Sequence, residues 1–194
     1  MADSIKNTVG QNDYYVKNSF EFKNFIDRIH IPQNYILISL DVTSLYTNIP
    51  INLVKHIIDK EWHSLKNFTT LPKEEFQKAL NFTLTTSLFQ FKDSFYKQLD
   101  GVAMGSPISS VIAQLVMEYA EKEIINNLSC DILFYKRYVD DCLLAISRGK
   151  EQQILEAFNS FNPKLQFTIE IEKEKQINFL DLTLIRENNK IYTK

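Results

Sequence analysis

The sequence contains little cysteine, glycine or proline: two cysteines, four glycines and five prolines among 194 residues. Cys130 and Cys142 lie far apart, and neither has a CxxC partner or a histidine at metal-ligand spacing. This argues against a zinc site and a disulfide scaffold, and it favours a reducing compartment. With 44% hydrophobic residues, the composition is typical of a globular chain rather than a fibrous or disordered one.

The chain also lacks an excess of positive charge and any long apolar run. Its 22 Lys and Arg against 24 Asp and Glu give a formal charge of −2, so a nucleic-acid partner would have to use a local basic patch. No segment approaches the roughly 18 uninterrupted apolar residues of a membrane span. The opening stretch MADSIKNTVGQNDYY lacks the apolar core of a signal peptide. We therefore expect one intracellular domain of ordinary size without a membrane partner.

Hydrophobic periodicity predicts the order of the elements. Residues 1–18 look like a loop, and Ser19 is the expected cap of the helix that follows it. Apolar residues at helical spacing predict helices over 20–29, 51–65, 73–89, 108–128 and 151–161. Continuous or alternating apolar runs predict strands at 35–42, on both sides of a turn at 92–93, on both sides of Asp140, at 165–172 and at 177–186. This order predicts an α+β fold with helices packed on one face of an antiparallel sheet.

Three acids stand where the predicted strands should carry buried side chains. Asp41 ends YILISL, and Asp140 and Asp141 divide the apolar hairpin FYKRYVDDCLLAI. Each acid alone is a normal turn residue. Converging carboxylates, however, are costly to desolvate unless a cation meets them, and Mg²⁺ is the cation that binds one or two carboxylates together with substrate phosphates. Because adjacent strand residues point to opposite faces, Asp140 is favoured over Asp141 as a metal ligand.

Three segments in order resemble the motifs of reverse transcriptases, most closely those of Penelope-like retroelements. ISLDVTSLYTNIP is similar to polymerase motif A, DGVAMGSPISS to motif B and YKRYVDD to motif C, and the resemblance extends from YVKNSFEF to INFLDLTLI. It implies a right-hand palm over residues 36–50 and 100–194. Residues 1–35 and about 50–100 would then supply partial fingers, and no thumb or endonuclease domain is identified.

The resemblance implies a role for each motif residue. Asp41, Asp140 and Asp141, with the carbonyl of Val42, would bind two Mg²⁺ ions, or Mn²⁺. Tyr46 would exclude a ribose 2′-hydroxyl, where the alternative is an ordinary core tyrosine. Two further residues are expected to contact the nucleotide: Met104 and Gly105. Ser110 departs from the family, which usually has a proline there.

Further residues are expected along the primer and template. Lys136 and Arg137 would contact phosphates, although solvated strand charges are the equal alternative. Phe179 and Leu180 resemble the hairpin that steadies the primer end, and they are as easily plain core and turn. Lys164 stands where these polymerases present a general acid to the leaving pyrophosphate.

By resemblance, the function is RNA-directed DNA synthesis, in which a primer 3′-hydroxyl attacks the α-phosphate of a deoxynucleoside triphosphate. The partners would be an RNA template, a DNA primer and the remaining fingers, thumb and endonuclease parts of a transposable element that integrates its DNA copy in the nucleus. Two alternatives stay open. One is a truncated, inactive retroelement copy that at most binds nucleic acid, and the other is a metal-dependent phosphodiesterase that uses the same acids.

Overall fold

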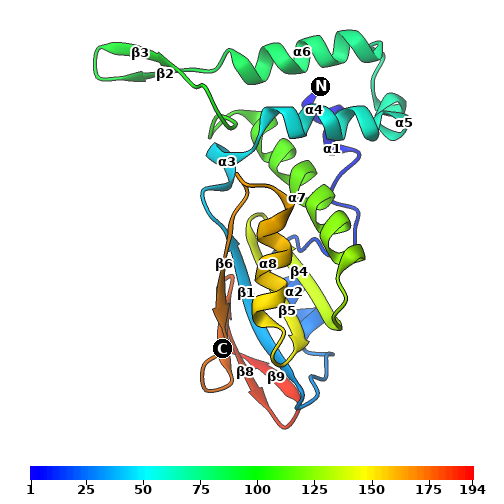
Figure 1. Cartoon of the computed structure of the whole chain (residues 1–194), viewed down its shortest axis with the longest axis vertical. Coiled ribbons are helices and arrows are strands. Elements are labelled where there is room, and N and C mark those ends of the chain that lie inside the picture. The colour runs from blue at the N-terminus through cyan, green and yellow to red at the C-terminus, as the bar shows by residue number, and fades with distance from the viewer. The chain divides into compact units, whose positions relative to one another are not determined.

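The structure is a computed structural model that describes all residues, 1–194. The chain forms two compact units (Figure 1). The first unit comprises Met1–Gln11 and Ser44–Lys122, and the second comprises Asn12–Thr43 and Glu123–Lys194. Each predicted palm range, 36–50 and 100–194, therefore contributes to both units.

The second unit is built on a four-stranded antiparallel sheet in the order β4-β5-β1-β6. Its strands are β1 (Tyr35–Val42), β4 (Ile132–Tyr138), β5 (Asp141–Ser147) and β6 (Phe167–Ile171). The two central strands, β1 and β5, are almost entirely buried, as expected of near-continuous apolar runs covered on both faces. The sheet confirms the predicted α+β class.

Helix α8 (Glu151–Phe161) covers one face of this sheet. It buries Ile154 and Phe158. The Phe158 ring stacks on Tyr135 of β4, with centroids 6.0 Å apart, and meets Phe167 of β6 edge-on at 5.0 Å. This aromatic cluster fixes the helix over the sheet whose central strands carry Asp41 and Asp141.

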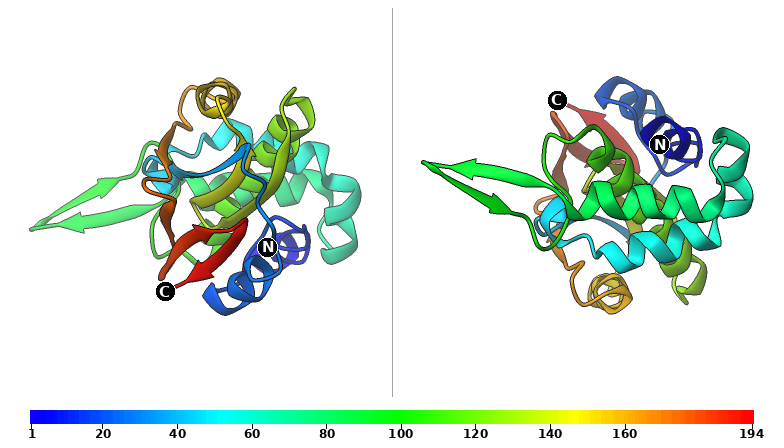
Figure 2. Two further views of the ribbon diagram at one scale, coloured as in Figure 1. Left: turned by 90° about the horizontal axis from the view of Figure 1, so that it is seen from below. Right: turned by 90° about the horizontal axis from the view of Figure 1, so that it is seen from above.

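The opposite face is covered by helix α2 (Ser19–Ile26) and a small sheet of β7 (Gln176–Phe179), β8 (Leu182–Glu187) and β9 (Lys190–Thr193) (Figure 2). The prediction of one strand over 177–186 is wrong because Leu180 and Asp181 form a turn, with Leu180 at φ 55°. Because Leu180 is apolar, the hydrophobicity pattern does not show that the strand ends there. Strand β9 was not predicted at all.

The cap of α2 also differs from the prediction. The Asn18 side chain accepts a hydrogen bond from the Glu21 backbone N–H at 2.9 Å, so Asn18 caps the helix. Ser19 is the first helical residue, and its hydroxyl donates to Asp181 at 3.2 Å. Both residue types are good caps, and the register of the helix decides between them.

The first unit is mainly helical. Its elements are α1 (Ala2–Lys6), α3 (Leu45–Asn48), α4 (Ile51–Lys60), α5 (Trp62–Leu65), a 3-10 turn η1 (Lys66–Phe68), α6 (Lys73–Thr85), the hairpin β2 (Leu88–Phe91) and β3 (Ser94–Lys97), and most of α7 (Pro107–Asn127). The predicted loop over 1–18 is wrong for α1, and the predicted helix over 51–65 is interrupted at Glu61. No helix, α7 included, has the length and apolar character needed to cross a membrane.

The β2–β3 hairpin turns at Lys92–Asp93, as predicted. It extends away from helices α4 and α6 of the same unit (Figures 1 and 2). Every residue of both strands is exposed. The hairpin is therefore held by its own ladder and by cross-strand pairs such as Phe89 on Tyr96, whose rings stack at 5.5 Å.

Candidate active site

The predicted catalytic acids come together at one end of the second unit's sheet. Strands β1 and β5 pair so that Asp41 lies directly opposite Asp141. Asp140 lies in the two-residue turn between β4 and β5, where Tyr138 pairs with Asp141. Because Asp140 belongs to the turn and not to the strand, strand alternation does not separate it from the other two acids.

The three carboxyl groups influence one another electrostatically. Partial burial raises the pKa of Asp41, and the negative charge of Asp140 raises it further. Burial raises the pKa of Asp141 to about 6, with smaller increases from Asp41 and Asp140. The Ser39 hydroxyl, which donates to Asp141 at 3.0 Å, and the Leu180 backbone N–H oppose this shift. The site thus concentrates negative charge and favours a cation.

The turn that carries Asp140 is held in an unusual conformation. Val139 has φ 56°, a value that β-branched residues rarely adopt. Arg137 lies beneath the turn with no exposed surface, and its Nη1 donates to the Val139 carbonyl at 3.0 Å. Strained backbone of this kind persists only where its surroundings fix it. The direction of the Asp140 side chain is therefore imposed by the buried core.

Lys136 and Arg137, the predicted phosphate contacts, are both engaged within the second unit. Lys136 Nζ donates to the Asp13 carbonyl and lies 4.3 Å from the centroid of the Phe25 ring. The fully buried Arg137 has no surface with which to meet a phosphate in this conformation. Its position assigns it the support of the acidic turn.

Phe179 and Leu180, the predicted primer residues, lie in and beside the β7–β8 turn. Phe179 is buried and packs edge-on against Phe22, with centroids 4.7 Å apart. Leu180 brings its backbone N–H to the Asp141 carboxylate. This contact joins the small sheet to the acidic site, and nothing in the local sequence of either segment indicates it.

The predicted nucleotide residues divide between the units. Val42 is buried in β1, beside Asp41. Tyr46 lies in α3 of the first unit, where its carbonyl accepts a hydrogen bond from the Val102 backbone N–H at 2.7 Å. Next to it, Gly101 has φ 71°, and a Cβ there would collide with the backbone of Thr47. This glycine lets α3 and the loop after β3 lie against each other.

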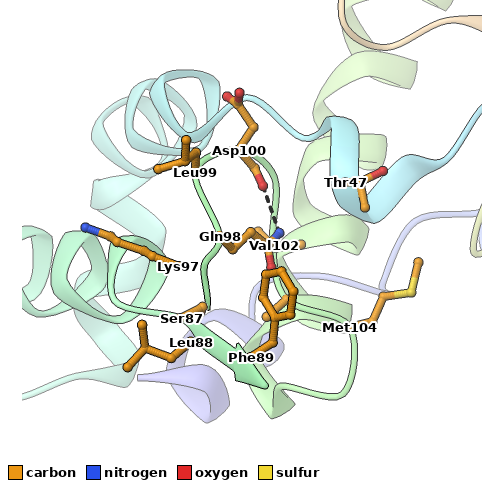
Figure 3. Close-up of a pocket in the computed structure, with 11 residues that line it drawn as sticks. Thr47, Ser87, Leu88, Phe89, Lys97, Gln98, Leu99, Asp100, Val102 and Met104 are labelled. Atoms are coloured by element: carbon orange, nitrogen blue, oxygen red, sulfur yellow. Dashed lines mark hydrogen bonds between the residues drawn. The ribbon is translucent and has the colours of Figure 1, made fainter. Parts of the chain in front are cut away.

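Met104 and Gly105 belong to the same loop of the first unit. Met104 is 70% exposed, and Gly105 has φ 88° with open space around it, so conformation and not crowding explains this glycine. A cavity of ≈ 690 Å³ lies beside Met104 (Figure 3). Its lining comes from the base of the β2–β3 hairpin and from the loop that contains Val102 and Ala103.

The side-chain donors at the acidic site are all oxygens, from three carboxylates. This is the donor set that Mg²⁺ prefers, and Mg²⁺ needs only one or two carboxylates because waters and substrate phosphates complete its shell. No three His, Cys, Asp or Glu side chains of the chain are arranged to hold a metal ion by themselves. The residues therefore suit an ion that arrives with its substrate better than a closed structural metal site.

An antiparallel sheet with acids at the end of its central strands, covered by α8 on one face and by α2 and the small sheet on the other, has the architecture of a polymerase palm. Residues 3–187 match the family model described as reverse transcriptase (RNA-dependent DNA polymerase), and the chain belongs to this family. A search of curated proteins gave no match.

Solved structures show the same fold. Telomerase from Candida albicans in complex with a TWJ fragment of telomeric RNA aligns with a TM-score of 0.75 and 13% identity over 100% of this chain and 37% of that one. Apo telomerase from Candida tropicalis, truncated from its C-terminal domain, gives 0.67 and 13% over 100% and 43%. The BmCPV RNA-dependent RNA polymerase gives 0.62 and 14% over 98% and 19%. The chain thus spans less than half the length of these proteins.

Proposed function

We propose that the chain is the palm-containing part of an RNA-directed DNA polymerase that transfers nucleotides from deoxynucleoside triphosphates to a primer 3′-hydroxyl. The in-register pairing of Asp41 with Asp141, with Asp140 in the adjoining turn, carries this proposal. Membership of the reverse transcriptase family supports it. The three sequence motifs favour a Penelope-like retroelement as the source.

Asp41 and Asp140 are proposed to hold two Mg²⁺ ions, or Mn²⁺, with the Val42 carbonyl and Asp141 in support. When bound, such ions neutralise charge on the triphosphate and on the attacking and leaving oxygens. The Ser39 hydroxyl and the Leu180 N–H keep Asp141 in place through the hydrogen bonds described above. Arg137 keeps the Val139 turn, and with it Asp140, in one orientation before substrate arrives.

The remaining roles follow the family resemblance. Tyr46 is proposed to exclude a ribose 2′-hydroxyl, and Met104 and Gly105 to contact the incoming nucleotide. Lys136 and Leu180 are proposed to contact the primer and template, whereas Phe179 belongs to the core. The RNA template and DNA primer would be bound together with further fingers and thumb segments of a full-length element.

Primer extension on an RNA template tests the proposal. We expect the 194-residue chain, alone or fused to fingers and thumb segments of such an element, to extend a DNA primer with Mg²⁺ and to stop when the ion is chelated. Asp41→Asn should abolish extension, whereas the same change at Asp27, an exposed acid paired with Lys23 in α2, should leave it unchanged.

Other outcomes would contradict the proposal. Extension by the Asp41→Asn variant at the wild-type rate would show that this acid takes no part in catalysis. Cleavage of nucleic acid without added nucleotides would favour a phosphodiesterase, and binding without extension in any fusion would favour an inactive copy.

A further inference from the structure

A second polar cavity lies in the second unit, at the end of β1 away from Asp41. Its volume is ≈ 370 Å³, and its lining consists of cationic and amide side chains: Gln33, Arg148, Lys175, Arg186, Asn188 and Asn189. It adjoins Tyr35, the first residue of β1, because Arg186 Nη1 donates to the Tyr35 carbonyl at 2.8 Å. Asp41 lies six positions after Tyr35, which is about 20 Å along a strand. The cavity is thus separate from the acidic site.

Two tight turns build the rim of this cavity. Glu174 and Lys175 (φ 51° and 63°) connect β6 to β7, and Asn188 and Asn189 (φ 48° and 65°) connect β8 to β9. Asparagine adopts this left-handed conformation readily. The Asn189 carbonyl accepts a hydrogen bond from the Ile31 N–H at 2.8 Å, so its turn is tied to the segment before β1. The backbone that carries Asn188 and Asn189 is therefore held in place.

Two arginines share one carboxylate in the wall. Glu172, whose side chain is 3% exposed, accepts from Arg186 and lies 3.5 Å from Arg148 Nη2. Arg186 is 7% exposed at its side chain and Arg148 is 49% exposed. With Lys175, the lining carries three positive charges against the one negative charge of Glu172. The cavity therefore has two uncompensated positive charges.

Arg186 also has a donor without an acceptor. Its Nε is buried and makes no hydrogen bond, while its two Nη atoms are engaged by Tyr35 and Glu172. A buried donor that lacks a partner costs about 1–3 kcal/mol. An acceptor-rich group entering the cavity could satisfy this donor after a small movement of the guanidinium.

The charged residues near the rim do not cancel this excess. The exposed side chains that flank the two turns without lining the cavity are two acids and two bases: Lys173, Glu174, Glu187 and Lys190. Their charges balance one another. The positive excess comes from the lining itself.

We propose that this cavity binds a phosphate group, either free phosphate or pyrophosphate or a phosphate of a nucleic-acid backbone. A doubly charged tetrahedral oxyanion matches two uncompensated cations, and arginine is the side chain best suited to bind it through several hydrogen bonds. Amide groups of Gln33, Asn188 and Asn189 supply further donors. The site shares no residue with the acidic site and does not depend on polymerase activity.

Isothermal titration of the 194-residue chain with inorganic phosphate and with pyrophosphate tests the site. We expect saturable binding that weakens at least 10-fold in Arg148→Gln and in Lys175→Gln. Lys173→Gln removes the same charge from the same turn outside the cavity and should bind as the wild type does. Arg186 is left intact because it also holds Tyr35 and Glu172, and melting curves confirm that each variant is folded.

A short single-stranded oligonucleotide distinguishes the two sources of phosphate. If the natural ligand is a nucleic-acid backbone, the Arg148 and Lys175 variants lose oligonucleotide affinity and inorganic phosphate competes with it. If the ligand is free phosphate or pyrophosphate, the oligonucleotide binds all variants equally and only the small anions discriminate. The proposal fails if the wild type binds none of these probes, or if Lys173→Gln weakens binding as much as Lys175→Gln does.

Failure of the phosphate proposal can be distinguished from failure of the polymerase proposal with one further variant. An Asp140→Asn variant should bind phosphate as the wild type does, whatever its extension activity. Loss of phosphate binding in that variant would contradict the separation of the two sites.

Discussion

The hairpin β2–β3 of the first unit and the hairpin β4–β5 of the second have almost the same turn, which β7–β8 also has around Leu180 and Asp181. In β2–β3, Phe91 pairs with Ser94 around Lys92 and Asp93, and in β4–β5, Tyr138 pairs with Asp141 around Val139 and Asp140. The first turn residue has positive φ in both, 54° for Lys92 and 56° for Val139. The second turn residue is aspartate in both.

The surroundings of the two turns differ completely. The β2–β3 pair has no third strand, and all its strand residues are exposed. In the other unit, β5 also pairs with β1, which places Asp41 opposite Asp141, and Arg137 is buried under the turn. An acidic turn alone is therefore not a site. The neighbouring strand and the buried core turn the same local geometry into a cation-binding arrangement.

The largest effect expected from this contrast is on catalysis. Asp140→Asn should reduce primer extension at least about 10³-fold, which corresponds to roughly 4 kcal/mol of transition-state stabilisation. Asp93→Asn, the same change at the equivalent position of the exposed turn, should leave the rate unchanged. Steady-state extension rates with Mg²⁺ measure both. Equal rates for the two variants would show that the surroundings of Asp140 confer no function.

The second effect is on stability. Arg137→Met should lower the free energy of unfolding by about 3 kcal/mol because the Val139 carbonyl loses a charged donor inside the protein. Lys97→Met in the exposed strand β3 should change it by less than about 0.5 kcal/mol. Denaturant unfolding followed by circular dichroism compares them. A small loss for Arg137→Met would mean that the turn is fixed by other groups.

The third effect depends on pH. The folded pKa of Asp141, about 6, exceeds the ordinary value of 3.8, so the folded chain binds more protons than the unfolded chain between these values. In metal-free protein, the stabilisation that protonation of Asp141 gives the folded state is complete below pH 3.8 and is lost as the pH rises through 6. Asp141→Asn should therefore raise Tm at pH 7 by a few degrees, roughly 1 kcal/mol after allowing for partial exposure.

The matched change in the other hairpin is Ser94→Asp, which reproduces the paired acids on an exposed ribbon. Thermal melts between pH 4 and 8 should show no new pH dependence in that variant. A dependence as strong as that removed by Asp141→Asn would mean that the adjacent acids, and not their burial, raise the pKa.

The smallest effect concerns backbone strain. Val139→Gly should stabilise the chain by about 1 kcal/mol. Glycine adopts positive φ without the steric penalty of valine, and this relief of strain outweighs the cost of glycine's greater freedom in the unfolded chain. Lys92→Gly should stabilise the chain by less than half as much, since lysine is not branched at Cβ and is less strained at positive φ. Differential scanning calorimetry resolves the two. A loss of stability in Val139→Gly would show that the valine side chain has a packing role that exceeds its strain.

The sequence predicted the elements that long apolar patterns define, including the central strands, helix α8 and the hairpins β2–β3 and β4–β5. The hydrophobicity pattern failed at the Leu180–Asp181 turn, where only the family resemblance indicated a hairpin, and at β9, a short strand that depends on its partner. The sequence also placed the three acids at strand ends. The register that sets Asp41 opposite Asp141 depends on how β1 and β5 pair, which the sequence of either strand alone does not specify. The hydrogen bond from Leu180 to Asp141 joins segments about forty residues apart, and no local pattern encodes such a contact.

Strand β2 also affects the handling of the purified chain. LFQF contains no charge and no proline, two of the features by which natural edge strands avoid pairing with other chains. Two molecules that meet through this edge can continue each other's ribbon, so prolonged storage at high concentration should produce soluble oligomers and then precipitate. A lysine in place of Phe91 is a simple way to extend the useful life of such a sample.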